Sequence, residues 1–182
     1  MTMDEHKLRT LIEGAQSHYG TQYKKLTGAA TTEAVRHYLL DLGLNVSSRD
    51  CYIRTVPREV DLLILRPAAK GHLGLIYKPE DVLCALEVKN SGSYGVQTSP
   101  KIRASFAAIS AACPSAHHAY VSLSEQCNYK HAVNTVTLDG YPAFTLFTTR
   151  QQRGQYVYDP TDEWTAFDLF VKRFVTGARV LK

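Results

Sequence analysis

The sequence of 182 residues lacks any long run of apolar side chains. No window approaches the roughly 18 consecutive apolar residues that a membrane-spanning helix requires, so we expect a soluble protein without a membrane partner. The first six residues also lack the basic segment and apolar stretch of a secretory signal. We therefore expect an intracellular, cytoplasmic protein.

The sequence also lacks paired cysteines. Its four cysteines, Cys51, Cys84, Cys113 and Cys127, are far apart and form no Cys-x-x-Cys motif, which argues against a zinc site or a dithiol redox centre. Three of them fall in or beside apolar segments. We interpret them as reduced residues of the core.

A strong charge bias is absent as well. The formal net charge of +4 permits association with a polyanion, but it is too small to indicate nucleic-acid binding by itself. The glycine-rich segment from Gly92 to Gly95 lacks the Gly-Lys-Ser/Thr ending of a phosphate-binding P-loop. Neither charge nor glycine content therefore identifies a function.

The length and the composition, 45% hydrophobic and 21% charged, are those of an ordinary globular protein, and we expect a single domain over residues 1–182. Apolar periodicity and turn residues predict helices over residues 4–17, 31–42, 100–112 and 162–176, and strands over residues 44–54, 60–66, 82–89, 119–123 and 143–149. The second helix has a threonine N-cap candidate and Gly43 as its stop. Residues 67–79 read as a long surface connection. This order predicts an α/β fold, with a central mixed β-sheet flanked by helices.

Three charged residues stand at the ends of apolar runs. Glu87 and Lys89 close the run that begins at Val82, and Asp61 opens the run that continues to Leu65. Residues 87 and 89 are two apart, so on a strand their side chains leave the same face. Charged side chains are rarely buried without a partner, so this placement requires a physical reason.

A divalent metal would supply that reason. Two carboxylates on neighbouring strands, Asp61 and Glu87, form a hard oxygen site suited to Mg²⁺ or Mn²⁺, and the backbone carbonyl of Val88 is placed to join them. Lys89 would then orient a water molecule or offset charge on a phosphoryl group. The alternative is a structural cross-strand salt bridge, which would leave one carboxylate unpaired.

These features together resemble the PD-(D/E)xK, or restriction-endonuclease-like, nuclease superfamily: a helix with an acidic residue, an Asp at the start of one strand and Glu-x-Lys at the end of the next, then a helix and a strand. The resemblance covers about residues 28–123 and implies an αβββαβ core, with an added N-terminal helix and an added C-terminal strand and helix. Val60 stands where the superfamily often has Pro. The resemblance implies a Mg²⁺-dependent endonuclease, with Asp61, Glu87 and Lys89 as its catalytic residues and DNA as the expected substrate.

The superfamily often has a glutamate on the helix that precedes the sheet, where it binds the metal directly or through water. Glu33 is the matching candidate in this sequence. The alternative is that Glu33 is a favourable carboxylate in the first turn of a helix.

Three further residues are candidates for nucleic-acid contact. Tyr94 follows the site in a glycine-rich loop and could stack on a base or sugar. Lys101 and Arg103 open the following helix and could contact a phosphate, or they could simply be solvated. Two other functions stay open: an inactive nucleic-acid-binding or scaffolding module, and an RNA-directed nuclease. A homodimer is a candidate assembly, since small nucleases that cut both strands often act as dimers.

Overall fold

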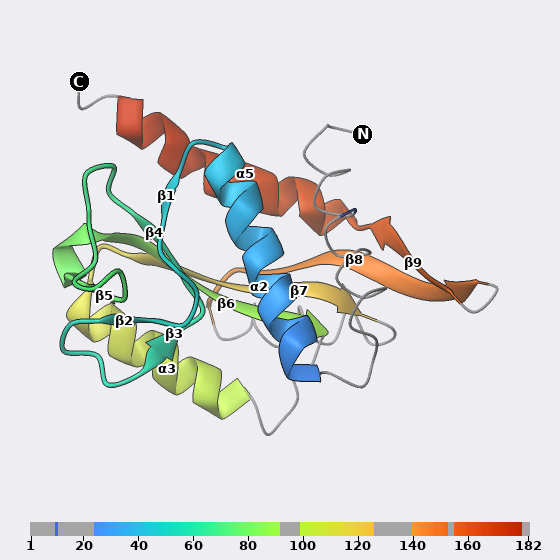
Figure 1. Cartoon of the computed structure of the whole chain (residues 1–182), viewed down its shortest axis with the longest axis horizontal. Helices are drawn as coiled ribbons and strands as arrows, with labels where there is room; N and C mark the ends of the chain where they lie inside the picture. The colour runs from blue at the N-terminus through green and yellow to red at the C-terminus, as the bar shows by residue number, and fades with distance from the viewer. Residues whose placement is uncertain (1–9, 11–23, 92–98, 126–139, 153–154, 180–182) are drawn as a thin grey trace.

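The structure is a computed structural model that describes residues 10, 24–91, 99–125, 140–152 and 155–179 (Figure 1). At its centre lies a six-stranded sheet with the order β1-β4-β6-β7-β8-β9. Strands β6, β7 and β8 are parallel to one another, whereas β1 and β6 are antiparallel to β4 and β9 is antiparallel to β8. The strands span Asn45–Val46 (β1), Leu62–Leu65 (β4), Val82–Ser91 (β6), His117–Glu125 (β7), Ala143–Gln152 (β8) and Gln155–Pro160 (β9). The predicted mixed sheet is confirmed.

Helices cover both faces of this sheet (Figure 1). The helices are α2 (Lys24–Asp41), α3 (Ser99–Ala112) and α5 (Asp162–Arg179). One core contains Leu62, Leu86 and residues of α2 and α5, whereas the other contains Leu63, Ala85 and residues of α3. Both faces of β4 and β6 are therefore buried, which explains why these strands read as nearly continuous apolar runs.

A second, smaller sheet has the order β3-β2-β5, with β2 (Cys51–Ile53) antiparallel to β3 (Glu59–Val60) and parallel to β5 (Ile76–Tyr77). The predicted strands 44–54 and 60–66 are each divided between the two sheets. The chain leaves the main sheet after Val46, and it returns to that sheet after Val60. The connection predicted over residues 67–79 contains β5, and a 3₁₀ turn follows at Pro79–Asp81.

Helix α2 is longer than predicted, because it is already formed at Lys24. The prediction of a threonine N-cap is therefore wrong. Thr32 is accommodated inside the helix because its hydroxyl donates to the Gly28 carbonyl, at 3.2 Å. The predicted stop is confirmed: Gly43 has φ +80°, and its N–H and that of Leu44 donate to carbonyls of the last turn, as in a Schellman motif.

The remaining elements agree largely with the predictions. Helix α3, strands β7 and β8 and helix α5 include the expected ranges, whereas β9 was not predicted. The helix expected over residues 4–17 lies, apart from Thr10, outside the described residues. Cys51, Cys84 and Cys113 are buried free thiols, as predicted, and Cys127 lies outside the described residues.

Membrane insertion finds no support in the helices that the structure describes, since none of them combines the length and the apolar character that a membrane span needs.

The aromatic face of α5 packs against the main sheet, and it generates a stability prediction. Phe167 is fully buried and contacts the Phe144 ring at a centroid distance of 5.5 Å, whereas Leu169 is 65% exposed on the same helix. We expect Phe167→Ala to lower the free energy of unfolding by about 3–5 kcal/mol, because it leaves a cavity in the core. Urea denaturation followed by circular dichroism measures this change.

Leu169→Ala is the matched control, and it should change the free energy of unfolding by less than about 0.5 kcal/mol. Equal losses for the two variants would contradict the packing of α5 described here.

Candidate active site

Asp61 is the residue at which the chain passes from the small sheet into the main sheet. Leu62 pairs with Leu86, so the antiparallel register brings Asp61 beside Glu87. The backbone N–H of Val88 donates to Asp61 Oδ2 at 2.7 Å. This bond fixes the carboxylate of Asp61 against the backbone of β6.

The ammonium group of Lys89 connects the two carboxylates. Its Nζ lies 2.6 Å from Glu87 Oε1 and 3.1 Å from Asp61 Oδ2. The side chains of Glu87, Asp61 and Lys89 are 16%, 20% and 31% exposed. The structure therefore brings the three predicted residues together in a partly buried cluster.

Burial and mutual contact shift the ionisation of this cluster. Burial raises the pKa of Glu87, the neighbouring Asp61 raises it further, and Lys89 partly offsets both effects. For Lys89, burial acts to lower the pKa, but the carboxylates of Asp61 and Glu87 outweigh it and the pKa is raised. The contacts with both carboxylates therefore favour the protonated form of Lys89.

The donor groups of the cluster fit a hard divalent cation. Lys89 occupies one oxygen of each carboxylate, and no hydrogen bond from the described residues reaches Asp61 Oδ1 or Glu87 Oε2. The Val88 carbonyl points to the same side of β6 as its N–H, which faces Asp61. One or two carboxylates, completed by water and substrate phosphate, are the usual protein ligands of Mg²⁺.

The described part of the chain contains no group of three or more His, Cys, Asp or Glu residues arranged to hold a metal ion. Among the described residues, the two carboxylates and the Val88 carbonyl are the oxygen atoms that the cluster itself offers to a cation.

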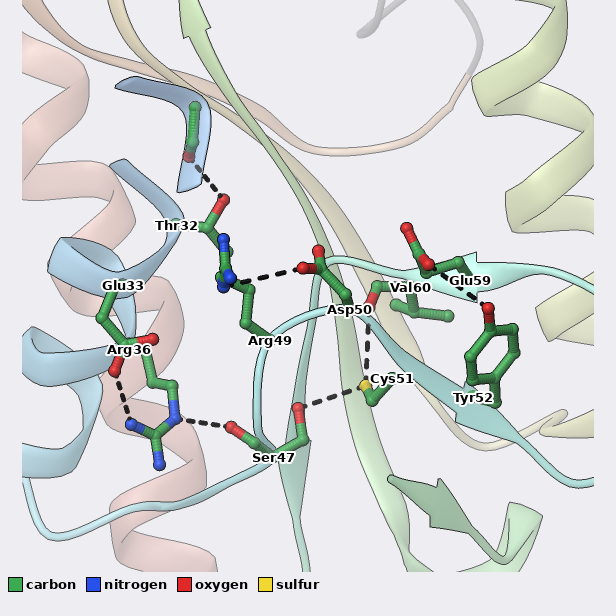
Figure 2. Close-up of polar contacts among 11 residues, drawn as sticks. Thr32, Glu33, Arg36, Ser47, Arg49, Asp50, Cys51, Tyr52, Glu59 and Val60 are labelled. Atoms are coloured by element: carbon green, nitrogen blue, oxygen red, sulfur yellow. Dashed lines mark hydrogen bonds and ion pairs between the residues drawn. The ribbon is translucent and has the colours of Figure 1, made fainter. Parts of the chain in front are cut away.

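Glu33 lies on α2, which packs on the face of the sheet opposite α3. The site is on the α3 face by alternation, since Glu87 is two residues from Ala85. Figure 2 shows the Glu33 carboxylate accepting a hydrogen bond from Arg36 Nη1, at 2.7 Å. His37 Nε2 is 3.5 Å from the same oxygen. These contacts give Glu33 partners on its own helix, and a role as a metal ligand stays a prediction.

Ser47 is a supporting residue that the sequence analysis did not identify. Its N–H donates to the Leu63 carbonyl at 3.0 Å, but the Leu63 N–H donates to the Ser47 hydroxyl, at 2.9 Å, and not to the Ser47 carbonyl. The Ser47 carbonyl instead accepts a hydrogen bond from Arg36 Nε at 2.7 Å (Figure 2). The hydroxyl thus replaces the carbonyl in the ladder and lets the strand leave the main sheet.

Two contacts continue this support towards Asp61. The Cys51 thiol lies 3.3 Å from Ser47 Oγ, and burial raises its pKa to about 11, so it remains a neutral thiol (Figure 2). The Asp50 N–H donates to the Asp61 carbonyl at 3.2 Å. Asp50 has φ +56°, a left-handed conformation that Asp tolerates better than most residues. The break in the apolar pattern at Ser47 and Ser48, followed by Asp50, is the sequence signal for this turn.

The end of β6 is also held from α2. The Thr31 hydroxyl donates to Asn90 Oδ1 at 2.9 Å, one residue beyond Lys89. Thr31 is therefore a tertiary contact and not a cap, which is a second reason why the cap prediction is wrong.

The predicted nucleic-acid contacts have different outcomes. Lys101 and Arg103 are exposed on α3, on either side of the buried Ile102. Their role in nucleic-acid binding stays a prediction. Tyr94 lies outside the described residues.

Comparison with solved structures relates the whole chain to known proteins. NucC of P. aeruginosa ATCC27853 in its cAAA-bound form has a TM-score of 0.62 and 11% identity, over 98% of this chain and 92% of that chain. NucC of E. coli MS115-1 gives a TM-score of 0.63 and 11% identity in its cAAA-bound form, over 99% of this chain and 91% of that chain. Its apo form gives a TM-score of 0.50 and 12% identity, over 97% of this chain and 92% of that chain.

These likenesses, at 11–12% identity, show the fold alone, and the α/β arrangement predicted from the sequence agrees with it. No protein-family model and no curated protein matches the sequence.

The Ser47 contacts generate a prediction. Ser47→Ala keeps the carbonyl that binds Arg36 but removes the acceptor of the buried Leu63 N–H. We expect it to lower the free energy of unfolding by about 1–3 kcal/mol, because an unsatisfied buried donor bears its full desolvation cost. Chemical denaturation measures this loss.

Ser48→Ala is the adjacent control, since the Ser48 hydroxyl donates only to an exposed Gly74 carbonyl, at 2.8 Å. It should lower the free energy of unfolding by less than about 1 kcal/mol. A Ser47→Ala variant as stable as the wild type would disprove the role of the hydroxyl in the ladder.

Proposed function

We propose that this chain is a divalent-metal-dependent endonuclease that hydrolyses phosphodiester bonds in DNA. The observation that carries the proposal is the convergence of Asp61, Glu87 and Lys89, with the ammonium of Lys89 in contact with both carboxylates. The cofactor would be Mg²⁺ or Mn²⁺, held by Asp61, Glu87 and the Val88 carbonyl. When bound, the ion would stabilise negative charge on a phosphoryl oxygen and lower the pKa of a water molecule.

The side chains of this chain would then perform distinct tasks. Asp61 is held by the Val88 N–H, so its free oxygen keeps a fixed direction. The protonated Lys89 would exchange part of its contact with the carboxylates for contact with the attacking water or with a phosphate oxygen. A fixed cation at that position would stabilise the charge that develops in the transition state.

The similar structures guide the design of the assay. NucC shares the fold, and two of the three structures compared are cAAA-bound forms. Cleavage should therefore be measured with and without cAAA, so that an enzyme that requires this nucleotide is not scored as inactive.

The prediction is cleavage of plasmid DNA with Mg²⁺ or Mn²⁺ and none with excess EDTA. Asp61→Asn, Glu87→Gln and Lys89→Met should each lower the cleavage rate by about 100-fold or more, the usual effect of removing one stabilising group at an active site. Gel electrophoresis of the time course measures the rate.

Glu80→Gln is the matched control, because Glu80 is an exposed carboxylate near the opposite end of β6. This variant should cleave DNA at the wild-type rate. Circular dichroism and thermal unfolding establish that each variant is folded. Full cleavage by the Glu87 and Lys89 variants would refute the assignment. Cleavage of labelled RNA in preference to DNA would change the substrate and keep the chemistry.

A further inference from the structure

The small sheet has one face that no other described element covers. Cys51 and Ile53 of β2 are buried, so Tyr52 and Arg54, which alternate with them, face outward. Tyr52 pairs with Glu59 of β3 and with Ile76 of β5, which places all three side chains on the same side. Continuing the parallel register brings Arg54 beside Lys78. We call this surface the outer face; its residues are Tyr52, Arg54, Glu59, Ile76 and Lys78.

The centre of the outer face is apolar. Tyr52 is 41% exposed and Ile76 is 40% exposed, and the adjacent Leu75 is 43% exposed. The Tyr52 hydroxyl donates to Glu59 Oε2 at 3.3 Å, which orients the ring (Figure 2). An oriented aromatic ring on an open sheet is the kind of platform on which nucleic-acid bases stack.

Cations flank this apolar centre. Arg54 and Lys78 are exposed, and neither makes an ion pair with another residue in the part of the chain that the structure describes. Arg58, also exposed, precedes Glu59 in the turn between β2 and β3. Three cations, Arg54, Arg58 and Lys78, therefore stand beside the Glu59 carboxylate, whereas the nearby Asp50 carboxylate is paired with Arg49 at 3.6 Å. The balance is positive, which complements a polyanion.

The outer face leads to the candidate active site. Glu59 is two residues before Asp61 along the same segment of chain. Strand β3, which carries Glu59, lies against β6, which carries Glu87 and Lys89. A chain of phosphates at Asp61 and Glu87 could therefore continue past Glu59 onto the outer face.

We propose that the outer face binds the DNA strand that continues from the candidate active site, with phosphates at Arg54 and Lys78 and a base or sugar against Tyr52. This inference rests on the proposed function. A second copy of the chain fits less well, because a two-fold contact would bring the same unpaired cations together. A polyanion meets no such repulsion.

The test is a binding assay in which Ca²⁺ replaces Mg²⁺, with the full chain and fluorescein-labelled DNA, both duplex and single-stranded. We expect Arg54→Gln/Lys78→Gln to raise the Kd for DNA about 10-fold at low salt. The variant should also reduce the slope of log K against log salt by about 1–2, since each lost phosphate contact removes about 0.9 for a duplex. Tyr52→Ala should raise the Kd for single-stranded DNA about 5-fold or more, and Tyr52→Phe should not.

Lys172→Gln/Arg173→Gln is the matched control, because it removes one lysine and one arginine from α5, on the other side of the main sheet. It should leave the salt slope unchanged. The inference is overturned if the Arg54/Lys78 variant binds DNA like the wild type, or if the control weakens binding equally. It is also overturned if the Arg54/Lys78 variant loses only self-association in sedimentation experiments.

The nuclease proposal fails separately. If the wild type binds DNA through the outer face but does not cleave it with Mg²⁺, the binding surface stands and the chain is a binding module. If it cleaves DNA while the outer-face variants bind normally, the nuclease stands and the outer face has no part in binding.

Discussion

The hydrogen bond from the Val88 N–H to the Asp61 carboxylate is the contact on which the candidate site depends. Asp61 lies between β3 of the small sheet and β4 of the main sheet, so its backbone belongs to neither strand. The pairing of Leu62 with Leu86 places Asp61 opposite Glu87 of β6. The hydrogen bond from the Val88 N–H then fixes the Asp61 side chain. A shift of this register by one residue would turn Asp61 away from Glu87 and Lys89. Because all four residues of β4 are aliphatic and buried, a shifted strand would bury similar side chains, and the polar contacts of Asp61 distinguish this register.

Among the described residues, Lys89 is the cation that contacts both carboxylates of the cluster. Lys89 neutralises the equivalent of one carboxylate, and burial raises the pKa of Glu87, which records the cost of keeping a second negative charge beside Asp61. A site optimised only for stability would pair its charges fully or replace them with apolar residues. A divalent cation bound as proposed would relieve the repulsion between Asp61 and Glu87.

The sequence was sufficient to identify this cluster, because charged residues at the ends of buried apolar runs are unusual and their period of two places them on one face. It was not sufficient for the supports. Thr31 resembles an N-cap, and only its contact with Asn90, 59 positions away in the sequence, explains its place inside α2. Ser47 falls in a segment that the sequence predicts as one continuous strand. That its hydroxyl accepts from the Leu63 N–H, while its carbonyl accepts from Arg36, depends on tertiary contacts that the local sequence does not reveal. The division of residues 44–54 between two sheets was unpredictable for a similar reason: local alternation predicts a strand, but it does not predict which strand will be its partner.

The two faces of the main sheet contribute differently to the candidate site. From the α2 side, Arg36 binds the carbonyl of Ser47 and Thr31 binds Asn90, so one helix holds both the edge of the main sheet and the end of β6. Glu33 is part of this support through its ion pair with Arg36. The opposite side carries the charged cluster and, beyond Glu59, the outer face with its unpaired cations. Contacts from α2 thus fix the strand edge and the end of β6, and fixed positions of this kind are what a reaction that depends on placed charges requires.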